Sequence, residues 1–168
     1  MKQIQLNCKL LLLLLCTLFF ISCEDERGYD DYDAGQTETV AMNGEWFVDI
    51  TNQAGGTTLA QHIIYRTYDT SLNDGSMYID NRSGTYMMRG KVNTDSNTLT
   101  FSATNEANIT RPGTTFTITE GKILKNVARS QSGNVVDSIY FRGVFSHTPG
   151  TTFIFSGHKR TGFLEDEY

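Results

Sequence analysis

The chain has 168 residues, carries 14 basic and 19 acidic side chains for a formal net charge of −5, and is rich in Gly (15), Phe (10) and Tyr (8). This length suits a leader followed by one domain that can bury its own core. The acidic balance argues against nucleic acid as a partner and against electrostatic docking on anionic lipid.

The first element is an apolar run, Leu10–Ile21, preceded by Lys2 and Lys9. A run of about a dozen apolar residues is shorter than the ~20 that a membrane-spanning helix needs, and it fits the hydrophobic region of a secretory signal. The acidic Glu24–Glu26 follow soon after, so the run cannot be extended. The pattern therefore predicts a signal peptide over residues 1–22.

The end of this run, Phe20-Ile21-Ser22-Cys23, resembles a bacterial lipobox. The resemblance implies diacylglyceryl transfer to the Cys23 thiol and cleavage before Cys23; the alternative is an ordinary signal peptide cleaved nearby. Several acyl chains would hold the protein on a membrane, because one chain alone binds only marginally. Glu24–Glu26 resemble the export signal of Bacteroidetes-type surface lipoproteins, which implies attachment to the bacterial outer membrane.

Removing residues 1–22 takes away two basic residues, two cysteines and no acid, which leaves 12 basic and 19 acidic residues. With Cys23 acylated, the mature domain has no disulfide and no cysteine metal site, so core packing must stabilise it. Residues 23–42 are acidic and poor in apolar side chains, which predicts a flexible tether. The domain itself is expected over residues 43–168.

From residue 43 onward, short runs rich in β-branched and aromatic residues alternate with clusters of Gly, Asn, Asp, Ser and Pro. Such spacing predicts strands joined by tight turns. In one run, Leu99, Phe101 and Ala103 share a face and the intervening hydroxyl residues share the other, as in an antiparallel sheet with one buried face. The expected strands are Glu45–Thr51, Ala60–Tyr68, Ser76–Asp80, Thr85–Val92, Thr98–Ala103, Thr114–Glu120, Lys122–Ala128, Val135–Phe145 and Thr151–Lys159.

These eight or nine strands, with no helix-period segment longer than two turns, predict an all-β domain. An antiparallel up-and-down barrel of about eight strands is favoured, because closure removes exposed strand edges and leaves room for side chains or one small ligand. A meander sandwich is the alternative.

Gly44-Glu45-Trp46 opens the first expected strand and resembles the Gly-x-Trp motif of lipocalins. The resemblance implies that Trp46 plugs the closed end of the barrel and that a basic residue near the last strand, Arg160 or Lys159, packs over its ring. Such a cation–π contact contributes ~0.5–2 kcal/mol, depending on exposure. The alternative is a Trp in an ordinary core and a solvated Arg160.

The two ends of the domain, Gly44–Val48 and Ser156–Phe163 with Glu165 and Asp166, are similar to those of the small Bacteroidetes lipoproteins known as lipid-binding putative hydrolases. The resemblance implies a lipocalin-like barrel and an apolar ligand. No motif in the chain accounts for the hydrolase part of that description.

Aromatic and Met side chains on the expected strands could line a ligand cavity, since such residues adapt to varied apolar ligands. Simple core packing is the alternative for each of them. The candidates are Tyr86, Met88, Phe101, Phe116, Phe141 and Phe145.

Candidate catalytic groups are few, and the chain has no Gly-x-Ser-x-Gly, His-Glu-x-x-His, P-loop or Rossmann pattern. His62 is expected on the face of Ala60 and Ile64, as a core or barrel-lining residue. His158 could meet Asp137 across neighbouring strands, as a base and its orienting acid. We expect no metal and no cofactor.

Three hypotheses about function remain open. The first is a lipid-anchored barrel that binds a small hydrophobic ligand without catalysis. The second is a weak esterase-type hydrolase, and the third is a non-catalytic partner in an envelope or glycan-uptake complex, with a solidly packed barrel. An apolar cavity would favour the first, a hydrogen-bonded Ser-His-Asp set the second, and a filled interior with an exposed aromatic patch the third.

Overall fold

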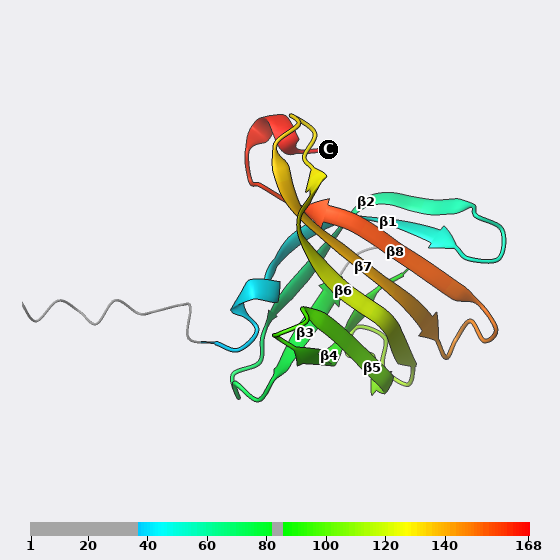
Figure 1. The fold of residues 1–168 in the computed structure, drawn as a ribbon. Coiled ribbons are helices and arrows are strands. Elements are labelled where there is room, and N and C mark those ends of the chain that lie inside the picture. Colours follow the sequence, from blue (N-terminus) through cyan, green and yellow to red (C-terminus); the bar gives the residue numbers. More distant parts are fainter. Residues whose placement is uncertain (1–36, 82–85) are drawn as a thin grey trace, which may run out of the picture. The chain divides into compact units, whose positions relative to one another are not determined.

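The computed structural model describes residues 37–81 and 86–168. The predicted signal peptide, Cys23 and the first part of the predicted tether lie outside the described residues. The described chain forms strands and two short 3-10 helices (Figure 1). The strands are β1 (Gly44–Asn52), β2 (Thr58–Asp69), β3 (Ser76–Asn81), β4 (Met88–Asp95), β5 (Thr100–Ala107), β6 (Thr115–Arg129), β7 (Val135–Phe145) and β8 (Thr152–Lys159), and the 3-10 helices are η2 (Val40–Met42) and η3 (Leu164–Asp166).

Each strand pairs with its neighbours along the chain, and β1 pairs with β8 to close the barrel. All of these pairings are antiparallel. Phe47 of β1, for instance, lies opposite Ile64 of β2 on one side and opposite His158 of β8 on the other. The prediction of an all-β up-and-down barrel of eight strands is therefore confirmed, and the closed ladder decides against the sandwich.

Two of the expected strands, Thr114–Glu120 and Lys122–Ala128, are parts of one long strand, β6. The ladder between β6 and β7 shifts register at their junction, where Glu120 has a φ of 54°, so the extra residues are accommodated in a bulge. Gly121 in this bulge lies opposite Phe101 of β5, and a Cβ there would lie 2.6 Å from the Phe101 ring. Glycine is needed at this point because any side chain would displace the ring.

The core lies inside the barrel, where alternate residues of the strands point inward. Trp46 and Ile50 of β1 are fully buried there. The helix η2 covers one end of this interior with Met42, which is fully buried although the sequence analysis assigns it to the tether. Lys125 Nζ donates a hydrogen bond to the Ala41 carbonyl oxygen at 2.7 Å, which ties η2 to β6.

The connections between strands alternate between the two ends of the barrel. The end that carries η2 also carries the β2–β3, β4–β5 and β6–β7 connections, because β1 starts there and the strands alternate in direction. We call it the η2 end, and we call the opposite end the mouth. The β6–β7 hairpin projects beyond the η2 end and has the C-terminal segment, residues 160–168, beside its tip (Figure 1). No helix in the described parts of the chain is long and apolar enough to cross a membrane.

Candidate functional site

Five of the six predicted ligand-lining residues are buried in the barrel core. They are Met88, Phe101, Phe116, Phe141 and Phe145. The rings of Phe141 and Phe155 stack with their centroids 4.4 Å apart, and the Phe101 centroid lies 5.8 Å from that of Phe141. These are the spacings of aromatic pairs in packed cores. The side chains therefore pack against one another, and a ligand that enters the barrel has to displace some of them.

Tyr86, the sixth candidate, lies at the mouth and is only partly buried. Its ring centroid is 5.1 Å from that of Phe153, and its carbonyl oxygen accepts a hydrogen bond from the Tyr65 hydroxyl at 3.0 Å. Burial raises the pKa of Tyr65, although its hydrogen bond with Asn81 acts in the opposite direction, so the hydroxyl keeps its proton at neutral pH. An apolar ligand that approaches the mouth would therefore meet Tyr86 and Phe153.

Trp46 occupies the interior at the η2 end. Its Nε1 donates to Thr67 Oγ1 at 2.9 Å, and Thr67 Oγ1 donates to the Met42 carbonyl oxygen at 2.6 Å. The Nζ of Lys159 lies 6.0 Å from the Trp46 ring, at the outer limit of a cation–π contact. A Cβ on Gly44 would lie 3.1 Å from Lys159 Cε, so the glycine leaves room for the lysine stem.

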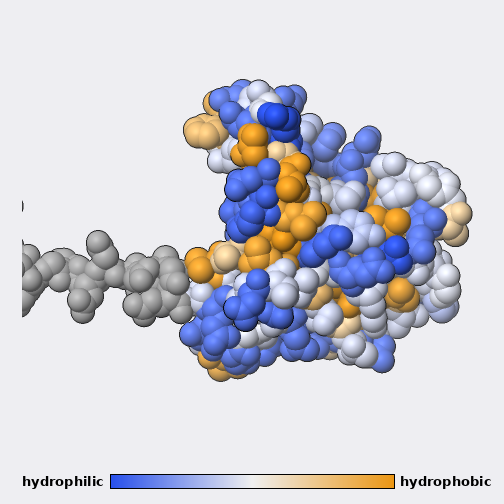
Figure 2. Space-filling model, in the orientation of Figure 1, coloured by the Kyte–Doolittle hydropathy of each residue, from blue (hydrophilic) through white to orange (hydrophobic). Residues whose placement is uncertain are grey.

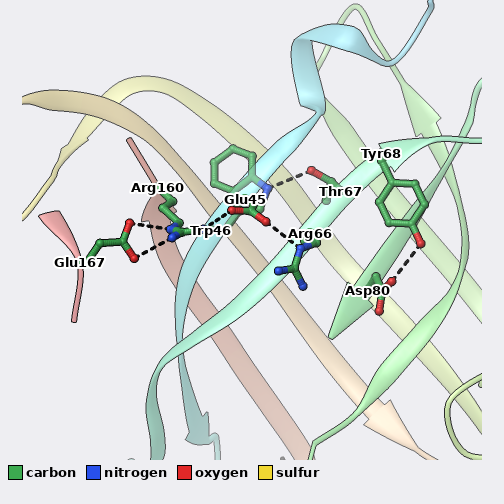
Figure 3. Close-up of polar contacts among 8 residues, drawn as sticks. All are labelled: Glu45, Trp46, Arg66, Thr67, Tyr68, Asp80, Arg160 and Glu167. Atoms are coloured by element: carbon green, nitrogen blue, oxygen red, sulfur yellow. Dashed lines mark hydrogen bonds and ion pairs between the residues drawn. The ribbon is translucent and has the colours of Figure 1, made fainter. Parts of the chain in front are cut away.

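Arg160, the other basic candidate, lies outside the barrel with its guanidinium carbon 5.9 Å from the centre of the Phe47 ring. It forms ion pairs with Glu45 of β1 and with Glu167, whose Oε1 is 2.7 Å from Arg160 Nε (Figure 3). The hydrogen bond from Arg160 outweighs partial burial and holds the pKa of Glu45 below its usual value. Arg160 thus fastens the C-terminal segment to β1, and Lys159 is the residue that reaches the Trp ring.

The two candidate histidines, His62 and His158, meet on the outer face of the barrel. The ladder between β1 and β2 shifts register near His62, which has a φ of 53°, so that Ala60 lies opposite the buried Ile50 while His62 stays on the face of Ile64, which lies opposite Phe47. The His62 ring stacks on Tyr168 with centroids 3.6 Å apart, and the His158 centroid lies 5.9 Å from the same ring. Both His158 and Tyr168 pack on Phe47. We call these four residues the outer aromatic cluster.

The outer aromatic cluster places acids and a serine around His158. Burial lowers the pKa of His158 and the neighbouring His62 adds to this effect, whereas Asp49 and Asp166 act against both. Ser138 of β7 lies opposite His158 in the ladder. Within the described residues, however, His158 Nε2 is buried and makes no hydrogen bond. The described chain therefore shows the residue types of a Ser-His-Asp set on one face, but not its hydrogen bonds.

The structure does not pair Asp137 with His158, which corrects the sequence hypothesis. Because Ser138 lies opposite His158, its neighbour Asp137 points to the other face of the sheet. There the Asp137 carboxylate accepts a hydrogen bond from Lys125 at 2.9 Å and lies 3.9 Å from Lys159 Nζ. Burial by itself would raise the pKa of Asp137, but the Lys125 hydrogen bond helps to hold it below its usual value. Asp137 therefore serves as a counter-ion at the η2 end.

An open pocket of about 490 Å³ lies on β4, β5 and β6 near the η2 end. Strand register alone brings its residues together, so no spacing in the sequence could have indicated it. Asp95 lies in its wall. A hydrogen bond from the Thr98 side chain is the largest cause that lowers the pKa of Asp95, and a hydrogen bond from the Thr98 backbone N–H adds to it. Phe101 is the one aromatic residue in the lining, and apart from Gly121 the others are polar or charged types, so the pocket offers an apolar ligand few hydrophobic side chains. The lining residues are Asn93, Thr94, Asp95, Thr100, Phe101, Ser102, Glu120, Gly121 and Lys122.

Within residues 37–81 and 86–168, no group of three or more His, Cys, Asp or Glu side chains is placed to hold a metal ion. The geometry defines a small, closed antiparallel barrel with an apolar interior. A family model described as "lipid-binding putative hydrolase" matches residues 31–164, and the chain belongs to that family, as its two ends implied. Comparison with curated proteins finds no significant match.

Proposed function

We propose that the protein is a lipid-anchored bacterial envelope protein that binds a small hydrophobic or lipid-like ligand without acting on it chemically. We propose this class of ligand because the model of a lipid-binding family matches residues 31–164. The described core is packed and not hollow, which by itself would favour a solidly packed partner protein, so the barrel supports ligand binding only through the chemistry of its core side chains, which are aromatic, Met and aliphatic. An apolar ligand gains most of its binding free energy from contact with such groups.

The ligand binds at the mouth, where Tyr86 packs against the core and is only partly buried. Tyr86 and Phe153 offer two rings there, and Met88, the first residue of β4, belongs to the buried core against which Tyr86 packs. A shift of the Tyr86 ring would expose Met88, whose unbranched side chain can adopt other rotamers around a ligand. An apolar group could then enter without unfolding any strand.

This part of the proposal is tested by solvent extraction and mass spectrometry of the protein purified from the cells that make it. We expect an apolar small molecule to copurify with the wild-type chain and to be depleted in Tyr86→Ser. Tyr140→Ser is the matched control, because Tyr140 lies on the outer face beside Lys122, whose Nζ is 5.1 Å from its ring centre. A wild-type protein that releases no apolar molecule, or equal depletion in both variants, would contradict the proposal.

The membrane attachment is assigned to Cys23. The apolar Leu10–Ile21, the cysteine and the acids that follow it support this assignment, and so does the net negative charge of the mature chain, which leaves acylation as the stronger means of attachment. We expect the wild-type chain to incorporate radioactive palmitate during growth, and Cys23→Ala to incorporate none. Label in Cys23→Ala would show that the acylated residue lies elsewhere.

The alternative function, an esterase-type hydrolase, is favoured by one observation: Ser138 lies opposite His158, and Asp49 is close enough to affect the pKa of that histidine. It predicts hydrolysis of p-nitrophenyl esters that disappears in His158→Gln and in Ser138→Ala alike. The ligand-binding proposal expects no difference between these variants and the wild-type chain.

A further inference from the structure

Exposed apolar side chains gather at the η2 end of the barrel. Leu164 is 90% exposed, Leu72 67%, Val127 63% and Phe163 59%. Exposure of large apolar side chains to water is unfavourable, and a group of them on one part of the surface marks a site that contacts a partner or a membrane. Val40 and Val135 are further exposed apolar residues at this end.

Hydrogen bonds hold the segments that carry these side chains together at this end. The backbone N–H of Glu38, just before η2, donates to Asn73 Oδ1 in the β2–β3 turn at 2.9 Å. On the other side, the N–H of Ser132 at the tip of the β6–β7 hairpin donates to Asp166 Oδ1 of η3 at 2.7 Å. Lys125 joins the hairpin to Ala41 of η2. The apolar side chains are therefore displayed on a connected support.

The same end has a hollowed surface. Figure 2 shows hydrophobic surface in the recess between the projecting β6–β7 hairpin and the segment where the described chain begins. Two of the three acids beside Leu164 have partners within the chain. Glu167 forms an ion pair with Arg160, and Asp166 accepts hydrogen bonds from Ser132 and from Thr161. Asp166 and Glu167 are therefore held by partners within the chain and are not free beside the Phe163–Leu164 pair.

The chain enters the barrel at this end. Thirteen residues separate Cys23 from Thr37, and the Thr37 carbonyl oxygen accepts a hydrogen bond from the N–H of Val40, the first residue of η2. Such a segment spans at most about 50 Å when fully extended, so an acylated Cys23 limits the distance of this end from the bilayer to about that length. We propose that the η2 end is a membrane-docking surface, with Phe163 and Leu164 inserted among the lipids and the mouth directed away. This inference rests on the acylation of Cys23 proposed above.

The experiment uses the single tryptophan of the chain as background. Trp46 is fully buried, so a second Trp placed on the surface reports its own surroundings. Acylated Leu164→Trp, Val127→Trp and Ile109→Trp are reconstituted in vesicles of phosphatidylethanolamine and phosphatidylglycerol with brominated acyl chains. Ile109 is the matched control, because it is 51% exposed in the β5–β6 connection at the mouth.

We expect the added emission of Leu164→Trp and Val127→Trp to be lost by bromine quenching, whereas that of Ile109→Trp persists. Two variants at the η2 end are used because one of them could fail to fold. Equal quenching at both ends, or none at the η2 end, overturns the docking proposal. If the emission of the added Trp shifts to shorter wavelength with rising protein concentration in the absence of vesicles, the surface binds a second copy of the chain. That result would also overturn the docking proposal. Palmitate incorporation, measured on each variant, separates these outcomes from a failure of the anchor itself.

Discussion

Phe141 in the barrel and Phe163 in the C-terminal segment show how differently one side chain can be used in this molecule. Phe141 is fully buried and packs on rings from other strands, whereas Phe163 is 59% exposed. The first lies in a strand whose alternation directs it inward, and the second lies just before a short 3-10 helix outside the sheet. The interior of the barrel stabilises the fold, and the η2 end displays apolar surface that the fold does not need.

The sharpest contrast between these regions is expected from truncating an aromatic ring in each. Trp46→Ala should lower the free energy of unfolding by ~3–5 kcal/mol, because it empties the closed end and leaves Thr67 without its donor. Phe163→Ala should change it far less. Urea unfolding followed by circular dichroism measures both, and a loss below about 1 kcal/mol for Trp46→Ala would mean that this end collapses to refill the space.

The outer aromatic cluster is intermediate between the two regions, and its stability contribution should depend on pH. The folded state lowers the pKa of His158, chiefly through burial, so the unfolded chain binds a proton at this site more readily. The site therefore destabilises the fold as the pH falls below the unfolded value of about 6.5. His158→Gln should lose less stability than the wild-type chain between neutral and mildly acidic pH, measured by urea midpoints. Parallel curves would show that the imidazole is solvated.

The smallest effect is expected at the η2 end. Leu164→Ser should change the free energy of unfolding by less than about 0.5 kcal/mol, since the side chain is 90% exposed and has little packing to lose. Thermal or urea unfolding in detergent measures this. A loss comparable to that of Trp46→Ala would show that Leu164 is part of the core and would remove the distinction between the two regions.

Much of the fold could be predicted from the chain because alternation and turn residues are local signals. Val135–Phe145 was predicted with the bounds that the structure shows. The bulges at His62 and Glu120 could not be predicted, since the positive φ at each depends on how neighbouring strands pair. Their effect was large, because one bulge put Ala60 opposite the buried Ile50 and so separated it from the outer face of Ile64 and His62, and the other joined two expected strands into β6.

The candidate site was less predictable, because it depends on register. A displacement of one residue decides that Ser138, and not Asp137, lies opposite His158. Likewise, the register between β1 and β8 places Lys159 opposite Trp46, whereas Arg160, just after β8, binds Glu45 and Glu167. Residue types alone could propose these partners, but they could not choose between neighbours.

The seam between β1 and β8 has a consequence for how this chain folds. The ion pair across it joins residues 115 positions apart, and the ladder beside it joins the first strand to the last. β1 therefore has one open edge until nearly the whole polypeptide is available. Proteins dominated by such distant contacts fold slowly, and their unpaired edges are exposed to aggregation meanwhile. A chaperone that covers the open edge of β1 during this interval would protect the folding chain from aggregation.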